Sequence, residues 1–301
     1  YYASNKKSFP FRMLDMMWSV VLYRKQVSYI LIDTYSTKAF WYAFVCSLLA
    51  RVLNIKYIPI LHGGDLPNRL KNNPKLCQMV FANAYQNVAP SGYLKQAFEN
   101  AGFKNVIHIP NSIEIDKYDF KTRAELTPKL LWVRAFASIY NPQMAVKVLQ
   151  QLQEKYPSAS LTMVGPDKDG SLQTTKAFAE SIGVAVNFTG QLAKEDWWQL
   201  ASEHDIFINT THFDNTPISV MEAMALGLPV VSTNVGGIPY LLADKENALL
   251  VNDDDDKAMK EAICSLLEDQ QKASDLTLNA RHFIEQMDWN VVKEEWKRVL
   301  R

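Results

Sequence analysis

Residues 213–239 read FDNTPISVMEAMALGLPVVSTNVGGIP, and this stretch predicts a buried helix that leads directly into a buried strand. Gly227 suits the end of the helix, and Pro229 suits the start of the strand. The apolar residues between the two prolines recur at nearly helical spacing: Ile218, Met221, Ala225 and Leu228. A helix that connects short apolar strands is the repeating unit of an α/β fold with a parallel sheet.

The same helix presents its N-terminus to a short loop. Pro217 suits the first turn, and Asn215 or Thr216 can cap it. The loop follows an apolar run at residues 205–209 that predicts another strand. The free backbone N–H groups at 216–219, where Pro217 itself has none, therefore predict a binding site for an anion such as a diphosphate.

Two carboxylates flank this helix start. Asp214 precedes the helix, and Glu222 lies inside it. Because carboxylates repel a diphosphate, their better partners are sugar hydroxyls, which donate hydrogen bonds. Gly236 and Gly237 predict a second turn that can approach a ligand closely.

Short apolar strands and amphipathic helices alternate through the rest of the chain, in two series separated by a polar stretch at 112–128 that predicts a linker. This pattern predicts an α/β chain of two Rossmann-like domains, with ligands beyond the carboxyl ends of the strands and in the cleft between the domains. The tail from residue 276 onward predicts helix. Strands are expected at 29–32, 57–61, 87–89, 106–109, 130–133, 160–164, 184–188, 205–209, 229–232 and 248–251.

Charge is balanced over the whole chain and unevenly distributed along it. Lys and Arg number 32 and Asp and Glu number 32, so no overall basic bias points to nucleic acid. Residues 1–123 carry a net charge of +9, and residues 124–301 carry −9. The basic first part favours anionic ligands or an anionic membrane surface, and scatter over the surface by chance is an equally open explanation.

The three cysteines, Cys46, Cys77 and Cys264, are widely spaced and form no CxxC pair, which indicates neither a disulfide framework nor a zinc site. They favour a reducing compartment, and therefore the cytoplasm. The longest apolar stretch, residues 39–49, is shorter than the ~20 residues that span a bilayer. It predicts a buried helix, so any membrane contact would be peripheral.

The order Asp214, seven residues, Glu222, followed by the rest of EAMALGLPVV and a Gly-Gly turn, resembles the motif of the retaining glycosyltransferases of family 4 (glycosyl transferases group 1), which have the GT-B fold. The resemblance implies that Asp214 contacts the transferred sugar and that Glu222 holds the ribose hydroxyls. It implies further donor contacts from the residues between them: Asn215, Thr216, Pro217, Ile218 and Ser219.

Other segments extend the resemblance in the same order along the chain. Arg134, after the strand at 130–133, resembles the arginine that holds the donor diphosphate, for which a planar guanidinium is well suited. Gly165 resembles the turn under the nucleotide, and Gly190 resembles the turn that lines the base. The family usually has a lysine five or six residues after the arginine, where this chain has Ile139 and Tyr140.

On the acceptor side, His62 ends the strand at 57–61 and resembles the family's histidine near the reacting carbon. Gly63, Gly64 and Asp65 follow it as further acceptor-side residues. The resemblance thus implies three catalytic residues: His62, Arg134 and Asp214.

The resemblance also divides the chain. It implies an acceptor domain at 1–124, a donor domain at 128–284, and a C-terminal helix at 285–301 that packs back on the first domain. Family members begin with a strand and a Gly-rich loop that residues 1–124 lack, so the N-terminal domain is expected to be incomplete or unusually small.

No metal and no cofactor are expected. Asp167–Asp169 matches the DxD pattern of metal-dependent glycosyltransferases of another fold, but Gly170 follows it and favours a polar turn. Asp253–Asp256 precedes a predicted helix and is expected to cap it while facing solvent. The donor substrate would be a UDP-sugar or a GDP-sugar.

The expected function is transfer of a sugar from this donor, with retention of configuration, to a saccharide or a lipid-linked saccharide. Such work belongs to polysaccharide biosynthesis in the cytoplasm, with peripheral contact to an anionic inner membrane face. The alternative is a non-catalytic GT-B protein that binds a nucleotide or a partner, which the missing lysine and the missing first strand favour.

Overall fold

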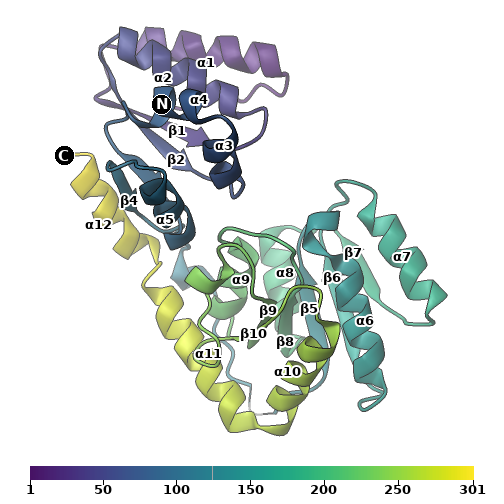
Figure 1. Ribbon diagram of the computed structural model, residues 1–301. Coiled ribbons are helices and arrows are strands. Elements are labelled where there is room, and N and C mark those ends of the chain that lie inside the picture. The colour runs from purple at the N-terminus through teal and green to yellow at the C-terminus, as the bar shows by residue number, and fades with distance from the viewer. Residues whose placement is uncertain (124) are drawn as a thin grey trace. The chain divides into compact units, whose positions relative to one another are not determined.

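The computed structural model describes residues 1–123 and 125–301 and divides into two compact units (Figure 1). The first unit comprises residues 1–111 and 293–301, and the second comprises residues 112–292. The predicted end of the first domain, residue 124, lies outside the described residues. Residues 112–123, which the sequence assigned to the first domain, belong to the second unit.

The first unit holds a parallel sheet in the order β1-β2-β3-β4. Its helices include α3, a seven-residue helix that the sequence did not predict, because the stretch LPNRLKN is too short to show a clear apolar period. The strands are β1 (Tyr29–Thr34), β2 (Lys56–Leu61), β3 (Asn87–Ala89) and β4 (Val106–His108). The helices are α1 (Phe9–Tyr23), α2 (Phe40–Val52), α3 (Leu66–Asn72), α4 (Pro74–Phe81) and α5 (Gly92–Asn100).

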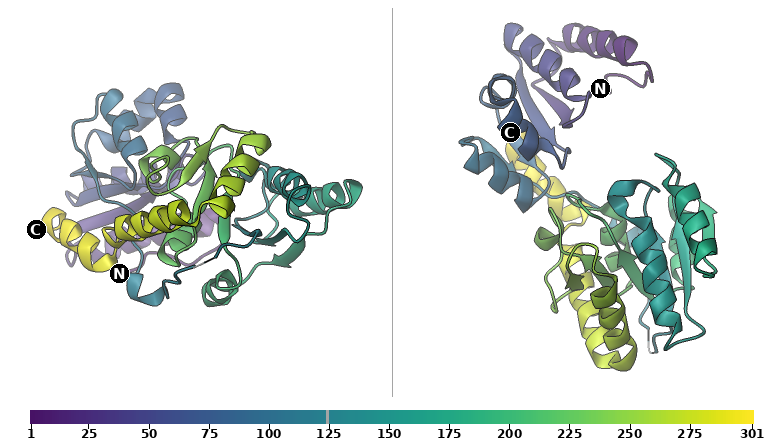
Figure 2. Two further views of the ribbon diagram at one scale, coloured as in Figure 1. Left: turned by 90° about the horizontal axis from the view of Figure 1, so that it is seen from below. Right: turned by 45° about the vertical axis from the view of Figure 1, so that its right-hand side comes forward.

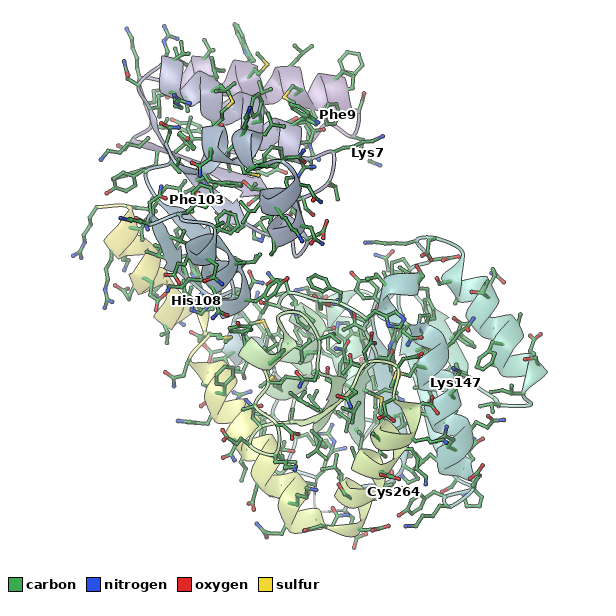
Figure 3. The ribbon with its side chains drawn as sticks, viewed as in Figure 1. Lys7, Phe9, Phe103, His108, Lys147 and Cys264 are labelled. Atoms are coloured by element: carbon green, nitrogen blue, oxygen red, sulfur yellow. The ribbon has the colours of Figure 1, made fainter. Side chains whose placement is uncertain are left out.

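Aromatic side chains fill much of the core of this unit. The ring of Phe81 meets that of Phe98 edge to face, with 4.8 Å between centroids, and Phe103 packs beside both (Figure 3). The apolar stretch at 39–49 lies in α2, as predicted, and buries Phe40 and Ala43. In the part of the chain that the structure describes, no helix is both long and apolar enough to cross a bilayer.

The second unit holds a parallel sheet in the order β10-β9-β8-β5-β6-β7. Its strands are β5 (Lys129–Val133), β6 (Ser160–Val164), β7 (Asn187–Gly190), β8 (Ile206–Asn209), β9 (Val230–Thr233) and β10 (Leu249–Val251). Its helices are α6 (Pro142–Gln153), α7 (Ser171–Ser181), α8 (Lys194–Ala201), α9 (Ile218–Ala225), α10 (Asp256–Glu268) and α11 (Gln270–Glu285), and α12 (Trp289–Val299) begins in it and ends in the first unit.

Helices cover both faces of the six-stranded sheet. Helix α6 lies alongside α7 and α10 over one face, as two views agree (Figures 1 and 2). Helices α8, α9 and the C-terminal half of α11 pack on the other face. The strands therefore carry apolar side chains on both sides, which is why they appear in the sequence as continuous apolar runs.

The stretch predicted as a linker, 112–128, is packed onto the second unit instead. Ile113 and Tyr118 are buried in its core, beside a short 3₁₀ helix at Ile115–Lys117. The guanidinium of Arg123 pairs with Asp205 at 3.5 Å and donates hydrogen bonds to the carbonyl oxygens of Ala201, His204 and Gly227. Because its few apolar residues lack a period, this anchoring was not evident from the sequence.

Two further expectations need correction. Strand β7 begins at Asn187 rather than 184, because its pairing with β6 starts there. The helical tail begins earlier than residue 276, at Gln270, and it is broken between α11 and α12. At the break, the Asp288 carboxylate accepts a hydrogen bond from the N–H of Ile115 at 2.9 Å.

Ser91, which follows β3, caps α5 through its side chain. Its Oγ accepts a hydrogen bond from the N–H of Leu94 at 3.2 Å. Ser91→Ala should lower the free energy of unfolding by about 1 kcal/mol, the usual value of such a cap. Urea unfolding measures the change, with Ser181→Ala on the exposed end of α7 as the control, which should change it by less than about 0.5 kcal/mol. Equal stability of the two variants would contradict the capping role.

Candidate functional site

The strand order of the second unit creates a topological switch point between β5 and β8. From β5 the chain proceeds outward through β6 to β7, and from β8 it proceeds in the opposite direction through β9 to β10. Ligands of open parallel sheets bind beyond the carboxyl ends of the strands at such a point. Arg134 directly follows β5, and the loop at 210–217 directly follows β8, so both lie at this position.

Buried hydrogen bonds fix the loop after β8. The Thr210 hydroxyl accepts a bond from the Trp132 indole at 3.0 Å and donates one to the carbonyl oxygen of Tyr140 at 2.9 Å. The N–H of His212 donates to the carbonyl oxygen of Ile139 at 2.8 Å. The loop is thereby held against the turn that follows Arg134.

Glycines let the backbone approach itself closely around these loops. A Cβ on Gly165, which has φ +152, would lie 1.8 Å from the carbonyl oxygen of Arg134. A Cβ on Gly237 would lie 2.1 Å from the carbonyl oxygen of Asn215. The Gly-Gly turn thus packs on the loop that carries Asp214 and supports it, with the N–H of Gly237 donating to the Asp214 carbonyl oxygen at 2.8 Å. Gly190 has φ +73 and open space around it.

Helix α9 begins one residue later than predicted. Pro217 is its N-cap, with an extended ψ of 117, and no side chain caps the helix. The prediction that Asn215 or Thr216 caps it was therefore wrong; instead, Asp214 Oδ1 accepts a hydrogen bond from the N–H of Asn215 at 2.8 Å. The Oγ of Ser219, in the first turn, is buried and has no hydrogen-bond partner among the described residues.

Arg134 and Asp214 form an ion pair, and each side chain is 14% exposed. The guanidinium also lies over the ring of Tyr140, 4.2 Å from its centroid. Burial lowers the pKa of Arg134, and Tyr140 opposes this shift. The Nε of Arg134 is buried without an acceptor among the described residues. The structure therefore brings together Arg134, which the resemblance assigned to the diphosphate of the donor, and Asp214, which it assigned to the sugar.

Glu222 is buried in α9, with its side chain 4% exposed. Its Oε1 accepts a hydrogen bond from the Tyr118 hydroxyl at 3.0 Å and contacts the Lys194 ammonium at 3.1 Å. Burial raises the pKa of Glu222, and the contacts with Lys194 and Tyr118 oppose that rise. A buried carboxylate with two donors on one oxygen can accept a further hydrogen bond on the other.

His62 lies just beyond β2 in the first unit. Its Nε2 is 3.1 Å from Oδ1 of Asp33 in the neighbouring strand β1, and its ring stacks on Tyr35 with 5.7 Å between centroids. The hydrogen bond from His62 lowers the pKa of Asp33. Gly63 is held close to the loop after β1, since a Cβ there would lie 2.5 Å from the N of Ser36. Gly64 and Asp65 form the turn before α3.

The two acidic segments, at Asp167–Asp169 and Asp253–Asp256, accept hydrogen bonds from backbone N–H groups of the chain itself. Asp167 accepts a hydrogen bond from the N–H of Gly170 at 3.0 Å. Asp169 accepts hydrogen bonds from the Ser171 hydroxyl and, at 2.8 Å, from the N–H of Ser138, and these bonds lower the pKa of Asp169 to about 2. Asp255 caps α10, as expected, by accepting from the N–H of Ala258 at 2.9 Å. The described residues contain no group of three or more His, Cys, Asp or Glu that could hold a metal ion.

A sequence profile of the family Glycosyl transferases group 1 matches residues 114–283, more than half of the chain. The chain belongs to this family. The match begins within the segment that packs onto the second unit and ends in α11, so the group 1 profile falls on the unit that contains Arg134, Asp214 and Glu222.

Curated proteins similar to this group 1 chain include an uncharacterized glycosyltransferase of Haemophilus influenzae, 28% identical over 156 residues, covering 52% of this chain and 44% of that protein. The amylovoran biosynthesis glycosyltransferase AmsK of Erwinia amylovora is 25% identical over 250 residues, covering 78% of this chain and 61% of that protein. The chain thus spans less than two thirds of the length of either relative.

Solved structures show the same architecture. Anabaena HepE in complex with UDP superimposes with a TM-score of 0.83 at 19% identity, covering 95% of this chain and 81% of that one. Sucrose-phosphate synthase of Thermosynechococcus elongatus gives a TM-score of 0.79 at 18% identity, covering 99% and 79%. The predicted GT-B fold of this group 1 chain, with two parallel α/β sheets, is confirmed.

Sequence reasoning missed several neighbours of the predicted residues. Asp33 carried a usable signal, because it lies near the end of a strand beside the one that precedes His62. Tyr118 and Lys194 had none, since each meets Glu222 only through the fold. Tyr140 was noted as the position of a missing lysine, and its stacking on Arg134 was not foreseen.

Proposed function

We propose that the protein is a glycosyltransferase that takes a sugar from a UDP-sugar or GDP-sugar and transfers it, with retention of configuration, to a saccharide or lipid-linked saccharide. The observation that carries this proposal is the convergence at the β5–β8 switch point. There the structure has the Arg134 guanidinium, a helix start whose Ser219 hydroxyl has no hydrogen-bond partner among the described residues, and the buried Glu222 carboxylate. The similar fold of HepE, solved with UDP and with UDP-glucose, supports a UDP-sugar donor.

The donor roles follow from charge. Arg134 and the N–H groups at the start of α9 stabilise the negative charge that develops on the departing diphosphate, and the Ser219 hydroxyl supplies one more donor. Glu222 accepts hydrogen bonds from the ribose. Asp214 orients the sugar, so donor binding requires Arg134 to exchange this carboxylate for phosphate oxygens. Gly165 lets the turn after β6 pack closely on the backbone of Arg134, and Gly190 leaves open space beside β7 for the nucleotide.

The reaction breaks the bond between the anomeric carbon and the diphosphate oxygen, whose electron pair leaves with the nucleotide. The acceptor oxygen then bonds to the same carbon from the same face, which retains configuration. Its proton passes to the departing phosphate oxygen, so no covalent protein nucleophile is needed. His62, oriented by Asp33 and followed by Gly63, Gly64 and Asp65, is assigned to the acceptor.

Nucleotide screening tests this function. Either UDP or GDP, together with sugar nucleotides of the same base, should raise the melting temperature, with about 2.7 kcal/mol of stabilisation at a hundredfold excess over Kd. Release of nucleoside diphosphate from the matching sugar, with an α-configured product from an α-configured donor in the NMR spectrum, would establish a retaining transferase. Binding of none of these nucleotides would overturn the assignment.

The competing function is a non-catalytic protein that binds a nucleotide. The observation that favours it is the pair Ile139 and Tyr140 at the family's lysine position, which leaves Arg134 as the one basic side chain assigned to the diphosphate. Stabilisation by UDP or GDP without release of diphosphate from any sugar nucleotide would support this alternative.

We propose further that the first unit binds an anionic membrane at the cytoplasmic face through α1. An exposed apolar stripe runs along this helix: Phe11 (65% exposed), Leu14 (62%), Trp18 (64%) and Leu22 (49%). Basic residues flank it: Lys6, Lys7, Arg12, Arg24 and Lys25, with Lys7 at the end near Phe9 visible in Figure 3. An apolar stripe with cationic flanks suits the interface of an anionic bilayer.

The protein should sediment with phosphatidylglycerol-containing vesicles, less so as salt rises. Neutralising the five flanking residues should weaken binding at least tenfold, because each well-placed cation contributes about 1 kcal/mol. Neutralising Lys257, Lys260 and Lys272 of the second unit is the control and should leave vesicle binding unchanged. Equal sedimentation with neutral and anionic vesicles would contradict this proposal.

A further inference from the structure

The two oxygens of the Glu222 carboxylate have different surroundings. Oε1 receives both protein contacts, from the Tyr118 hydroxyl at 3.0 Å and from the Lys194 ammonium at 3.1 Å. Among the residues that the structure describes, none makes a hydrogen bond to Oε2. The carboxylate is therefore held by one oxygen, and the other is available to a ligand.

Tyr118 is itself fixed by packing. The residue is 6% exposed, and its ring lies against Trp198 of α8 with 4.5 Å between centroids. Its carbonyl oxygen accepts a hydrogen bond from Arg281 of α11 at 3.4 Å. The hydroxyl therefore reaches Glu222 from a rigid position.

Helix α8 supplies the other two residues around Glu222 and Tyr118, which are Lys194 and Trp198. Lys194 and Trp198 are four residues apart and so lie on one face of the helix. Trp198 supports the Tyr118 ring, and Lys194 contacts the carboxylate directly. Since the Lys194 side chain is 62% exposed, solvent weakens its contact, and the buried Tyr118 hydroxyl is the better-defined donor.

Electrostatics give Tyr118 a single role. Burial and the neighbouring Glu222 raise the pKa of Tyr118, so its hydroxyl stays protonated and donates. A buried carboxylate remains ionised only when donors compensate for its lost hydration. Loss of this donor would favour the protonated form of Glu222, which accepts hydrogen bonds less well.

We propose that Tyr118 is a positioning residue for nucleotide binding: it holds Oε1 of Glu222 so that Oε2 faces the ribose hydroxyls, with Lys194 as a second, weaker support. This rests on the proposed function, in which Glu222 binds the ribose. The segment at 112–123, which precedes the sheet of the second unit, thereby becomes part of the donor site.

Tyr118→Phe tests the proposal, because it keeps the ring on Trp198 and removes only the hydroxyl. Calorimetry with UDP and GDP, and with the 2′-deoxy and 3′-deoxy forms of whichever binds, measures affinity. Tyr118→Phe should weaken binding of the ribonucleotide about five- to tenfold, which is less than the loss expected on removing Glu222 itself, because the carboxylate remains and Oε1 keeps its contact with Lys194. One of the two deoxy forms lacks the ribose hydroxyl that donates to Glu222. For that nucleotide, Tyr118→Phe should change the affinity less than about twofold.

The pH dependence gives a second readout. Nucleotide binding should fall as pH drops through the pKa of Glu222, and in Tyr118→Phe this fall should begin at a higher pH, because a contact that lowers the pKa is gone. Tyr156→Phe removes a tyrosine hydroxyl elsewhere in the same unit and should move neither readout. Lys194→Met, at an exposed position, should show the same selectivity with a smaller loss.

The outcomes separate the two proposals. Unchanged affinity and pH profile in Tyr118→Phe, or equal losses for ribose and deoxyribose nucleotides, would overturn the positioning role while wild-type binding leaves the proposed function standing. Failure of the wild type to bind UDP or GDP, or an unchanged affinity in Glu222→Gln, would overturn the donor site and the positioning role with it.

Discussion

Replacing Arg134 by methionine should lower the rate of sugar transfer by about a hundred- to a thousandfold, the usual effect of removing one preorganised donor from developing negative charge. The effect is expected to be large because Ile139 and Tyr140 stand where the family has a lysine, so the other contributions assigned to the diphosphate come from backbone N–H groups and the Ser219 hydroxyl. Steady-state turnover of the sugar nucleotide measures it.

The Arg134 variant also removes the partner of Asp214, whose buried charge would then cost about 3–5 kcal/mol of stability. The double variant Arg134→Met with Asp214→Asn restores stability and should stay slow, which separates folding from catalysis. Arg134→Lys keeps the charge without the planar fork and should recover part of the rate. Arg298→Met, on the exposed end of α12, is the matched control.

Tyr140→Lys introduces the family's cation next to Arg134. Because the Tyr140 ring lies under the guanidinium, this change removes a stacking partner and places two cations together. It should therefore not exceed the wild-type rate. A rate of transfer in Arg134→Met equal to that of Arg298→Met would show that another group holds the diphosphate.

Replacing Glu222 by alanine should weaken UDP or GDP binding by about ten- to a hundredfold, as expected for loss of one hydrogen bond to a charged acceptor. The wild-type affinity should also depend on pH. Burial raises the pKa of Glu222, and the ionised form is the better acceptor, so affinity is fully present above that pKa and falls as pH drops through it.

Glu222→Gln should remove this acidic fall in affinity, because glutamine does not titrate. Glu261→Gln, on the exposed face of α10, should retain both the affinity and the pH profile of the wild type. Calorimetric titration across pH 4 to 8 distinguishes the variants. A Glu222→Ala protein that binds the nucleotide as tightly as the Glu261→Gln control would exclude a ribose contact.

The sequence alone determined the order and type of most elements of this chain. Apolar runs and helical periodicity reflect which face of a segment is buried, and burial is a local property that each segment carries in its own residues. The helix after Asp214 and the strand before Arg134 were therefore predictable, as was the α/β class. The resemblance supplied the roles proposed for these residues.

Only the tertiary structure decided which of these residues meet. Tyr118 and Glu222 are 104 positions apart, and His62 and Asp33 are 29 apart. The pairing of Arg134 with Asp214 depends on β5 lying beside β8, an order that no local pattern encodes. The packing of residues 112–123 on the second unit likewise depends on surfaces that distant segments form together. Local sequence specifies which side of each element is buried. Contacts between distant segments depend on how the buried surfaces of all elements fit together, and only the folded chain determines that fit.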